Sequence, residues 1–194
     1  MVRVVVLISG SGSNLRAFLD GCAAGTIPAE VVAVGADVDA SGLDHARHYG
    51  IPTFVEQFAR GDDRDEWGKR LADTVASHEP DLVILSGFMR LVPPVFVHRF
   101  APMLLNTHPA YLPEFPGAHA VRDAFEAGVP ETGASVIVVD DGVDTGPILA
   151  QRRVLIREDD TEQTLHDRIK VVERELLADV VRDIANREHA IEEN

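Results

Sequence analysis

The sequence predicts an α/β protein with a doubly wound, mostly parallel sheet. Through the first hundred residues, short runs of β-branched and apolar residues alternate with segments of helical periodicity, a pattern typical of right-handed βαβ units. The runs are apolar at successive positions, as expected of strands buried on both faces. After residue 130, two strand-like runs follow each other directly and a long amphipathic segment comes last, which predicts an antiparallel hairpin and a long final helix.

Length and composition indicate one domain, residues 1–194, of a soluble globular protein. No apolar run approaches the ~18 residues of a membrane span, and the chain enters its first strand without a signal-peptide cleavage site. The single cysteine, Cys22, excludes an internal disulfide, fits a cytoplasmic location and is expected to pack rather than react. The net charge of -14 opposes binding to nucleic acid or to an anionic membrane. We therefore expect small-molecule substrates, and a homodimer is left open.

The first predicted strand, residues 2–8, leads into the turn Ser-Gly-Ser-Gly-Ser-Asn at residues 9–14. A helix follows, with apolar spacing at Leu15, Phe18, Leu19 and Cys22. Two glycines let backbone N–H groups approach an anion at the start of that helix, which favours a phosphate cradle. The alternative is a tight turn in which Ser or Asn caps the helix. Position 15 lacks the third glycine of a dinucleotide fingerprint, so a monophosphate is favoured over a dinucleotide.

The next elements continue the alternation. Strands are predicted over 31–36, 53–55 and 82–85. Helices are predicted over 41–49, with Ser41 as the cap, and over 62–78, with Trp67, Leu71 and Val75 on the buried stripe. The segment 87–91, Gly-Phe-Met-Arg-Leu, lies at the carboxyl end of a strand, where α/β sheets bind ligands. Its apolar side chains either line a flat cleft or belong to the core.

The second half is organised around residues 103–117, which begin as an apolar strand and turn polar at Asn106 and His108. These two side chains project on the same side because they are two residues apart. Prolines and Gly117 then hold the chain in a shaped loop. The remaining predicted elements are helices over 94–100 and 118–127, strands over 133–139 and 148–156, an acidic loop over 140–146, a final helix from 161 to about 186, and a frayed end over 189–194.

The sequence contains no convincing metal site. His45 and His48 have a helical spacing that can bind metal, but no cysteine or carboxylate cluster completes a site. A zinc site of His108, His119 and Asp144 is an alternative that leaves Asn106 without a role. The loop from 140 lacks the length and terminal Glu of an EF-hand. We therefore expect no metal.

Four segments carry a resemblance to a known family. They are Ile-Ser-Gly-Ser-Gly-Ser-Asn at 8–14, Gly-Phe-Met-Arg-Leu at 87–91, Leu-Asn-Thr-His-Pro-Ala-Tyr-Leu-Pro with Phe-Pro-Gly at 105–117, and Asp-Thr-Gly-Pro at 144–147. Over nearly its whole length the chain resembles the phosphoribosylglycinamide formyltransferases, folate-dependent enzymes of purine synthesis. Methionyl-tRNA formyltransferase and formyltetrahydrofolate deformylase share the Asn-x-His-Pro element. Those two usually carry an additional domain, which we do not expect here.

The resemblance implies a Rossmann-like formyltransferase fold and formyl transfer from the co-substrate 10-formyltetrahydrofolate to the amine of glycinamide ribonucleotide. It implies a phosphate-binding half, 1–100, and a catalytic and folate-binding half, 101–188. The implied catalytic residues are Asn106, His108 and Asp144. The implied nucleotide-binding residues are Gly12, Ser13, Asn14, Lys170 and Glu173. The implied folate-binding residues are Arg64, Met89, Arg90, Leu91, Val92, Asn106, Asp140, Asp141, Gly142, Val143 and Asp144. Two positions depart from the family pattern, with Lys170 replacing a frequent Gln and Ile137 a frequent His.

The implied chemistry suits these residue types. Attack of an amine on a formamide carbon builds negative charge on oxygen, to which Asn106 and a protonated His108 can donate. Asp144 can keep the imidazole protonated and oriented and help to take the amine proton. Two alternatives stay open. One is a formyltetrahydrofolate deformylase, in which water replaces the amine. The other is a non-enzymatic regulatory module, in which residues 10–14 and Asp37 form a partial Rossmann site for NAD.

Overall fold

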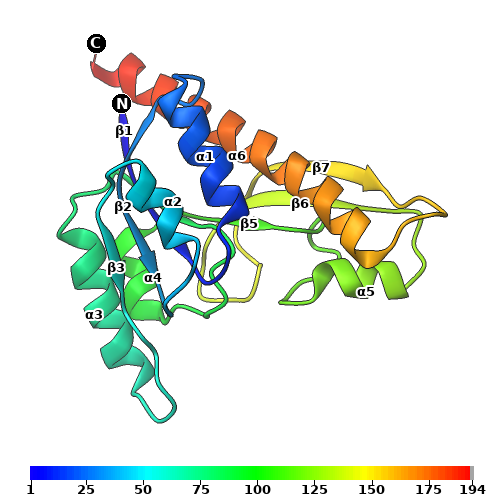
Figure 1. Cartoon of the computed structure of the whole chain (residues 1–194), viewed down its shortest axis with the longest axis horizontal. Coiled ribbons are helices and arrows are strands. Elements are labelled where there is room, and N and C mark those ends of the chain that lie inside the picture. The colour runs from blue at the N-terminus through cyan, green and yellow to red at the C-terminus, as the bar shows by residue number, and fades with distance from the viewer. Residues whose placement is uncertain (193–194) are drawn as a thin grey trace.

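The computed structural model describes residues 1–192, with side chains described through residue 187. The described chain forms a seven-stranded sheet in the order β3-β2-β1-β4-β5-β6-β7 (Figure 1). Strands β1 to β5 run parallel, whereas β6 and β7 are antiparallel to their neighbours. The strands are β1 (Val2–Ile8), β2 (Ala29–Ala36), β3 (Thr53–Val55), β4 (Leu82–Leu85), β5 (Leu104–His108), β6 (Glu131–Val138) and β7 (Ile148–Leu155). The predicted fold class, including the antiparallel hairpin, is confirmed.

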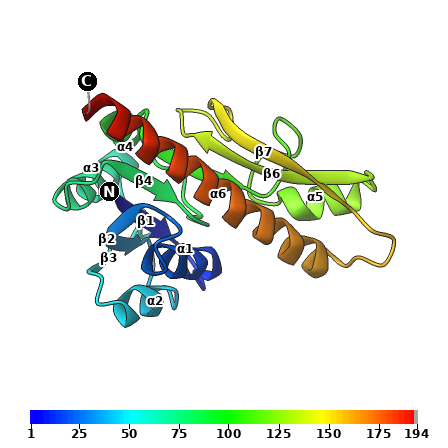
Figure 2. The same cartoon turned by 90° about the horizontal axis from the view of Figure 1, so that it is seen from above.

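Helices cover both faces of the sheet (Figure 2). One face carries α1 (Ser13–Ala23), α2 (Leu43–His48), α5 (Ala120–Glu126) and α6 (Glu162–Glu192), and the other carries α3 (Arg64–Ala76) and α4 (Pro94–Phe100). The first face buries an apolar cluster that includes Leu15 of α1 and Ile169 of α6. The second buries a cluster around Trp67 of α3 and Phe96 of α4. Burial on both faces explains why the strands are apolar at successive positions.

The strand order reverses between β1 and β4. From β1 the chain moves outward to β2 and β3, and it then returns to the other side of β1 as β4. Leu7 of β1 pairs with Leu85 of β4, so the segments that follow these strands leave the sheet side by side. They are the turn 9–14 and the segment 87–91. Ligands of doubly wound sheets bind at such a switch point, beyond the carboxyl ends of the strands.

Strand β5 brings Asn106 and His108 to the same edge of the sheet. Asn106 pairs with Leu85 of β4 on one side and with Ile137 of β6 on the other. His108 lies opposite Ser135 of β6. The polar residues predicted at a strand end therefore belong to the strand itself, and pairing with neighbouring strands fixes their directions.

Predicted element boundaries agree with the structure to within two residues, except at the end of α6. This helix continues to Glu192 because no glycine or proline follows residue 186 to end it. Of the residues expected to fray, 189–192 are helical, and 193–194 lie outside the described residues. The predicted Ser41 cap is wrong, since α2 begins after Gly42 without a side-chain cap. No helix of the described chain has the length and apolar character needed to cross a membrane.

Candidate active site

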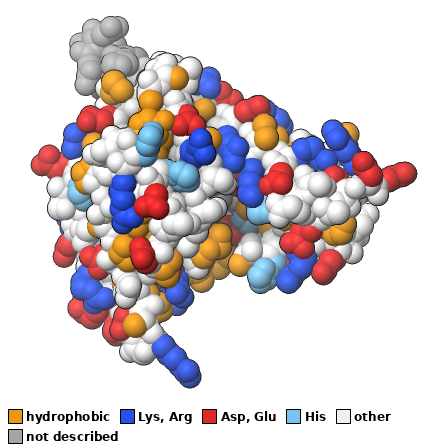
Figure 3. All heavy atoms as spheres, in the orientation of Figure 1, with side chains coloured by type: hydrophobic (Ala, Val, Ile, Leu, Met, Phe, Trp, Pro, Cys, Tyr) orange, Lys and Arg blue, Asp and Glu red, His pale blue; other side chains and the backbone are white. Residues whose placement is uncertain are grey.

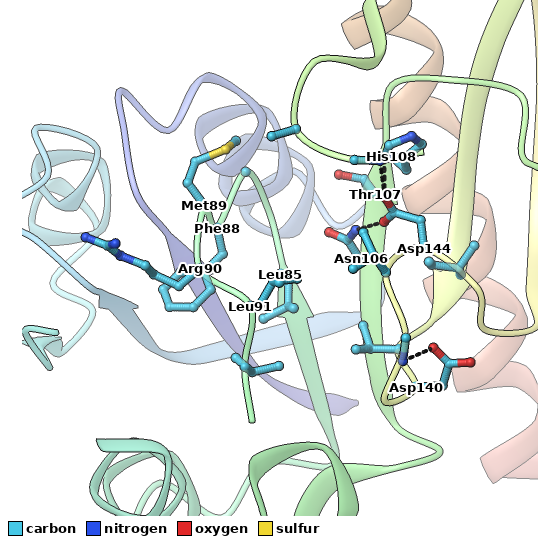
Figure 4. Close-up of a pocket in the computed structure, with 18 of the residues that line it drawn as sticks. Leu85, Phe88, Met89, Arg90, Leu91, Asn106, Thr107, His108, Asp140 and Asp144 are labelled. Carbon is cyan, nitrogen blue, oxygen red and sulfur yellow. Dashed lines mark hydrogen bonds and ion pairs between the residues drawn. The ribbon is translucent and has the colours of Figure 1, made fainter. Parts of the chain in front are cut away.

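A cavity of about 290 Å³ opens at the carboxyl ends of β4 and β5 (Figure 4). Its walls are the segment 87–92 on one side and β5 with the loop after β6 on the other. The predicted site residues that line it are Met89, Arg90, Leu91, Val92, Asn106, His108, Asp140, Gly142, Val143 and Asp144. The fold thus collects three separate stretches of sequence around one space.

Asn106, His108 and Asp144 converge at one end of this cavity (Figure 4). Asn106 Nδ2 lies 3.4 Å from Asp144 Oδ1, and His108 Nδ1 lies 3.4 Å from Asp144 Oδ2. Both distances are long for hydrogen bonds. The carboxylate is nevertheless anchored, because the Gly117 N–H donates to Oδ2 over 2.8 Å. The backbone of Asp144 has a φ of 54°, a strained conformation of the kind that clusters at functional sites.

The loop after β5 orients the His108 ring. His108 is 4% exposed, and its Nε2 lies 2.9 Å from the carbonyl oxygen of Phe115. A carbonyl oxygen can only accept, so Nε2 carries a proton and donates to it. Nδ1 is then the ring nitrogen that faces Asp144. The loop is held in place from β6, where the Ser135 hydroxyl donates to the Ala110 carbonyl over 2.8 Å.

The three aspartates of the loop after β6 have different surroundings. The Asp140 carboxylate accepts from the Gly142 N–H over 3.0 Å and from the Thr145 hydroxyl over 2.8 Å, so it shapes the turn. Asp141 does not line the cavity, and its Oδ2 lies 3.0 Å from His98 Nε2 of α4. Of the three carboxylates, that of Asp144 therefore meets the catalytic candidates.

Two predicted folate-binding arginines support the segment 87–91 from its outer side. Arg64 does not line the cavity, but its Nη1 donates to the Leu91 carbonyl over 2.7 Å. Arg90 lines the cavity, yet its guanidinium points away from His108 and Asp144 (Figure 4). Both guanidinium groups lie over the ring of Phe58, at 5.1 and 5.7 Å from its centre. The arginines therefore brace the wall of the cavity.

The turn 9–14 forms the start of α1. Gly12 precedes the helix with a φ of 66°, a left-handed conformation that favours glycine. No side chain caps α1, so the alternative of a Ser or Asn cap is wrong, and the first N–H groups of the helix lack helical partners. Gly42 packs against the turn, since its N–H donates to the Gly10 carbonyl over 3.1 Å. A Cβ at Gly12 would lie 3.0 Å from the Gly42 Cα.

A second, smaller cavity lies between α1 and α6, with Asn14, Thr107, Glu173 and Arg174 as its polar lining. Glu173 is 5% exposed, and burial raises the pKa of its carboxyl group. Asn14 Nδ2 donates to Glu173 Oε2 over 3.3 Å, while Asn14 Oδ1 accepts from Arg174 Nε over 2.9 Å. Arg174 thus orients the Asn14 amide, which links the start of α1 to the buried carboxyl group.

Basic side chains surround this region. Lys170 lies one turn before Glu173 on α6, with its Nζ 3.4 Å from Asp167. Figure 3 shows Lys and Arg side chains gathered over α1 and α6 beside a hollow in this face. In a chain with a net charge of -14, such a cluster provides the local positive potential that an anion needs.

Strand β5 is the common wall of the two cavities. Asn106 and His108 line the larger one, whereas Thr107 between them also lines the smaller one, beside Asn14 and Glu173. Successive side chains of a strand point to opposite faces, so one strand serves both spaces. The two cavities are therefore neighbours across a single layer of backbone.

Two alternatives from the sequence do not fit this geometry. Asp37 is 3% exposed and already accepts from Ser9 Oγ over 2.5 Å and from Arg90 Nε over 2.7 Å, so it has no free carboxylate for a dinucleotide ribose. Among residues 1–187, whose side chains the structure describes, no three His, Cys, Asp or Glu side chains are grouped so that they could hold a metal ion. The arrangement of His108, His119 and Asp144 is accordingly not that of a zinc site.

Several supports of the site were not predicted from the sequence. Arg174 carries no motif, and only its position beside Glu173 on a helix could have drawn attention to it. The Phe115 carbonyl and the Gly117 N–H are main-chain groups, which leave no side-chain signal. The dipeptide Pro-Gly at 116–117 does mark a fixed turn, and this was the available clue.

The fold and the site define a formyl transferase, and the chain belongs to this family, whose model matches residues 2–181. Its relatives include phosphoribosylglycinamide formyltransferases. The Mycobacterium tuberculosis enzyme is 50% identical over 183 residues, which cover 94% of this chain and 85% of that protein. The Escherichia coli enzyme is 38% identical over 194 residues, which cover 100% of this chain and 92% of that protein. The crystal structure of glycinamide ribonucleotide transformylase 1 from Symbiobacterium toebii matches with a TM-score of 0.92 and 42% identity, over 96% of this chain and 88% of that one.

Proposed function

We propose that the protein transfers the formyl group of 10-formyltetrahydrofolate to the amine of glycinamide ribonucleotide, a step of purine biosynthesis. The observation that carries this proposal is the convergence of Asn106, His108 and Asp144 at the end of a cavity that shares β5 with the smaller cavity between α1 and α6. An amine held on one side of the strand end can meet a formyl group held on the other.

The residues of the larger cavity fit the flat ring of a folate. Met89, Leu91 and Val143 are exposed apolar side chains on its walls. A flat heteroaromatic ring needs apolar contact on its faces and hydrogen bonds at its edge, a combination typical of ligand pockets. We assign the lining residues of 89–92 and 140–144 to folate binding. Arg64 acts through the Leu91 carbonyl, and Asp141 acts by tying the loop to α4.

The turn 9–14 and α6 fit the nucleotide. We place its phosphate at the N–H groups of Gly12, Ser13 and Asn14, where the start of α1 carries partial positive charge. Glu173 then accepts hydrogen bonds from the ribose, with Lys170 beside it on the same face of α6. This placement directs the amine end of the nucleotide toward the carboxyl end of β5.

The three catalytic candidates suit the transfer. As the amine nitrogen bonds to the formyl carbon, negative charge develops on the formyl oxygen, and Asn106 Nδ2 and His108 Nδ1 donate to it. Asp144 compensates the charge of the doubly protonated ring. The bond from the formyl carbon to the folate nitrogen then breaks. That nitrogen receives the proton lost by the amine, through Asp144 or a water that Asp144 holds.

An assay with both substrates tests the proposal. The protein is mixed with 10-formyltetrahydrofolate, with and without glycinamide ribonucleotide, and the folate absorbance is followed. We expect turnover only when both are present, with the formylated nucleotide as product. Formate release without the nucleotide indicates a deformylase instead, and absence of turnover under both conditions contradicts formyl transfer.

A further inference from the structure

We propose that Asp37 is a positioning residue that acts through Ser9 and Arg90 to hold the segment 87–91 in its folate-binding conformation. The proposal rests on the function proposed above. Asp37 follows β2 and lines neither of the two cavities. Its effect on the substrates is therefore indirect, through the residues that it holds.

Asp37 is a buried carboxylate with two partners of different kind. Its Oδ1 accepts from the Ser9 hydroxyl over 2.5 Å, and its Oδ2 accepts from Arg90 Nε over 2.7 Å. The Asp37 side chain is 3% exposed, whereas that of Arg90 is 39% exposed. A buried charge is tolerated only when it is paired, so Asp37 constrains the position of Arg90. Arg90 belongs to the wall of the larger cavity.

Ser9 connects Asp37 to the same wall through further hydrogen bonds. Its N–H donates to the Gly87 carbonyl over 3.1 Å, and its Oγ accepts from the Met89 N–H over 2.8 Å. A hydroxyl has one proton, and Asp37 takes the hydrogen bond from it, which leaves an oxygen lone pair for Met89. The carboxylate therefore fixes the hydroxyl in the orientation that holds the segment.

The arrangement also joins the two substrate regions. Ser9 is the first residue of the turn 9–14 that we assign to the phosphate, and Met89 and Arg90 belong to the wall that we assign to the folate. Only side chains and backbone groups of 9, 37 and 87–90 lie along this connection. Loosening it should affect folate binding first, because three of the contacts end on that wall.

The chain contains a natural reporter for this segment. Trp67 is the only tryptophan, is fully buried, and stacks on Phe88 with ring centres 6.4 Å apart and planes within 5°. A displacement of the segment 87–91 changes the surroundings of the indole. The fluorescence of Trp67 therefore reports on the wall without any need for turnover.

The first test is Asp37→Asn, which keeps the shape and one acceptor but removes the charge and sets an amide N–H against Arg90. We expect the KM for 10-formyltetrahydrofolate to rise about tenfold, the factor that corresponds to one charge-assisted hydrogen bond. We expect kcat to change by no more than about twofold, because the catalytic groups are untouched. The emission of Trp67 should shift in the free protein. Asp39→Asn, at an exposed position two residues further on, is the matched control and should change neither quantity.

Two further variants keep the proposal testable if Asp37→Asn does not fold. Ser9→Ala removes the link between Asp37 and Met89 and should raise the folate KM in the same way. Arg90→Gln leaves the buried carboxylate without a counter-charge, so adding Asp37→Asn to Arg90→Gln should recover part of the lost folate affinity.

The outcomes separate this proposal from the proposed function. The inference is overturned if Asp37→Asn or Ser9→Ala lowers only the melting temperature and leaves both the folate KM and the Trp67 emission unchanged. That result would show a purely structural role. Additive losses in the Arg90→Gln pair would also overturn the inference. Absence of formyl transfer by the wild-type protein contradicts the proposed function instead, and the Trp67 comparison is independent of that result.

Discussion

The Phe115 carbonyl oxygen accepts a hydrogen bond from His108 Nε2 at 2.9 Å, and this contact decides which ring nitrogen faces the cavity. Because the acceptor belongs to the main chain, the ring orientation depends on the path of the loop and not on the side chain at position 115. The same loop supplies the Gly117 N–H to Asp144. One loop therefore sets both members of the His108–Asp144 pair.

Replacing Asp144 by Asn should reduce kcat while keeping the shape of the site. The variant removes the negative charge that faces His108, so kcat should fall by roughly 10² or more, the scale of one acid–base contribution. His108→Ala should be at least as damaging, and the double variant should be far from additive because the two groups act as a unit. Values of kcat at saturating substrates for the two single variants and the double variant measure this. Asp141→Asn in the same loop should cost far less, and near-wild-type turnover of Asp144→Asn would refute the pairing.

Gly12→Val should raise the KM for the nucleotide. Valine adds a Cβ against the Gly42 Cα and must adopt a φ of 66°, so it disturbs the turn that we assign to the phosphate. Gly25→Ala is the control, since Gly25 has a φ of 72° but open space around it. This control should lose stability and keep the nucleotide KM. If both variants show the wild-type nucleotide KM, the phosphate does not bind at this turn.

Glu173→Gln should stabilise the protein at high pH and weaken nucleotide binding. Burial raises the pKa of Glu173 above its ordinary value of 4.5. Below that value the carboxyl group is neutral in both the folded and the unfolded state. Between 4.5 and the raised pKa, the carboxyl group ionises in the unfolded state while the buried one stays protonated, so the folded state loses stability as the pH rises toward the raised pKa. The neutral variant escapes this loss.

Melting temperatures of Glu173→Gln and wild type, measured from about pH 4 to about pH 8, check this expectation. The two melting temperatures should be similar at the acidic end of the range. As the pH rises, the melting temperature of Glu173→Gln should increasingly exceed that of the wild type. The exposed Glu175→Gln of the same helix should not reproduce this trend. A constant difference between variant and wild type across the range would contradict the assignment.

Arg174→Met should raise the nucleotide KM although Arg174 carries no family motif. Its guanidinium holds Asn14 Oδ1, and without it the Asn14 amide is free to turn away from Glu173. The loss should be about tenfold, as for one hydrogen bond to a charged group. Arg182→Met, on the outer part of α6 where Arg182 pairs with Asp179, is the matched control. Equal nucleotide KM values for the two variants would show that Arg174 has no part in the site.

Cys22 should react slowly with thiol reagents and should not be needed for activity. Burial raises the pKa of its thiol from 9.0 to about 11, so the thiolate fraction near pH 8 is roughly 10²-fold lower than at the ordinary pKa. Labelling rates measured against a free thiol, together with turnover of Cys22→Ala, test this. Rapid labelling coupled to inactivation would assign Cys22 a chemical role.

The fold could be predicted from the sequence because its strands are buried on both faces. Runs such as residues 4–8 and 82–85 are apolar at every position, and the helical spacing between the runs indicated an α/β architecture. The catalytic candidates could be predicted because Asn106 and His108 stand two residues apart at a strand end. The catalytic role of Asp144 could be predicted only from the family resemblance, because an aspartate in an acidic loop has no distinguishing sequence pattern.

The remaining contacts depend on tertiary structure. Arg90 was expected to contact the folate, and only the fold shows that Asp37, 53 residues away, binds its guanidinium. The same is true of Asp141, which is paired with His98 of α4. Each cavity also takes residues from both halves of the chain, with 87–92 in the wall of the larger one, and Glu173 and Arg174 beside Asn14 in the smaller one. Local sequence patterns do not record such long-range pairings.

The position of Thr107 between Asn106 and His108 has a consequence for how the protein can change. A substitution at position 107 changes the wall of the smaller cavity, beside Glu173, whereas a substitution at 106 or 108 changes the wall of the larger cavity. Different residues of one five-residue strand therefore shape each of the two cavities. Lengthening or shortening that strand by a single residue would instead exchange the two sets of side chains between the two faces. β5 should therefore accept replacements at individual positions far more readily than any insertion or deletion.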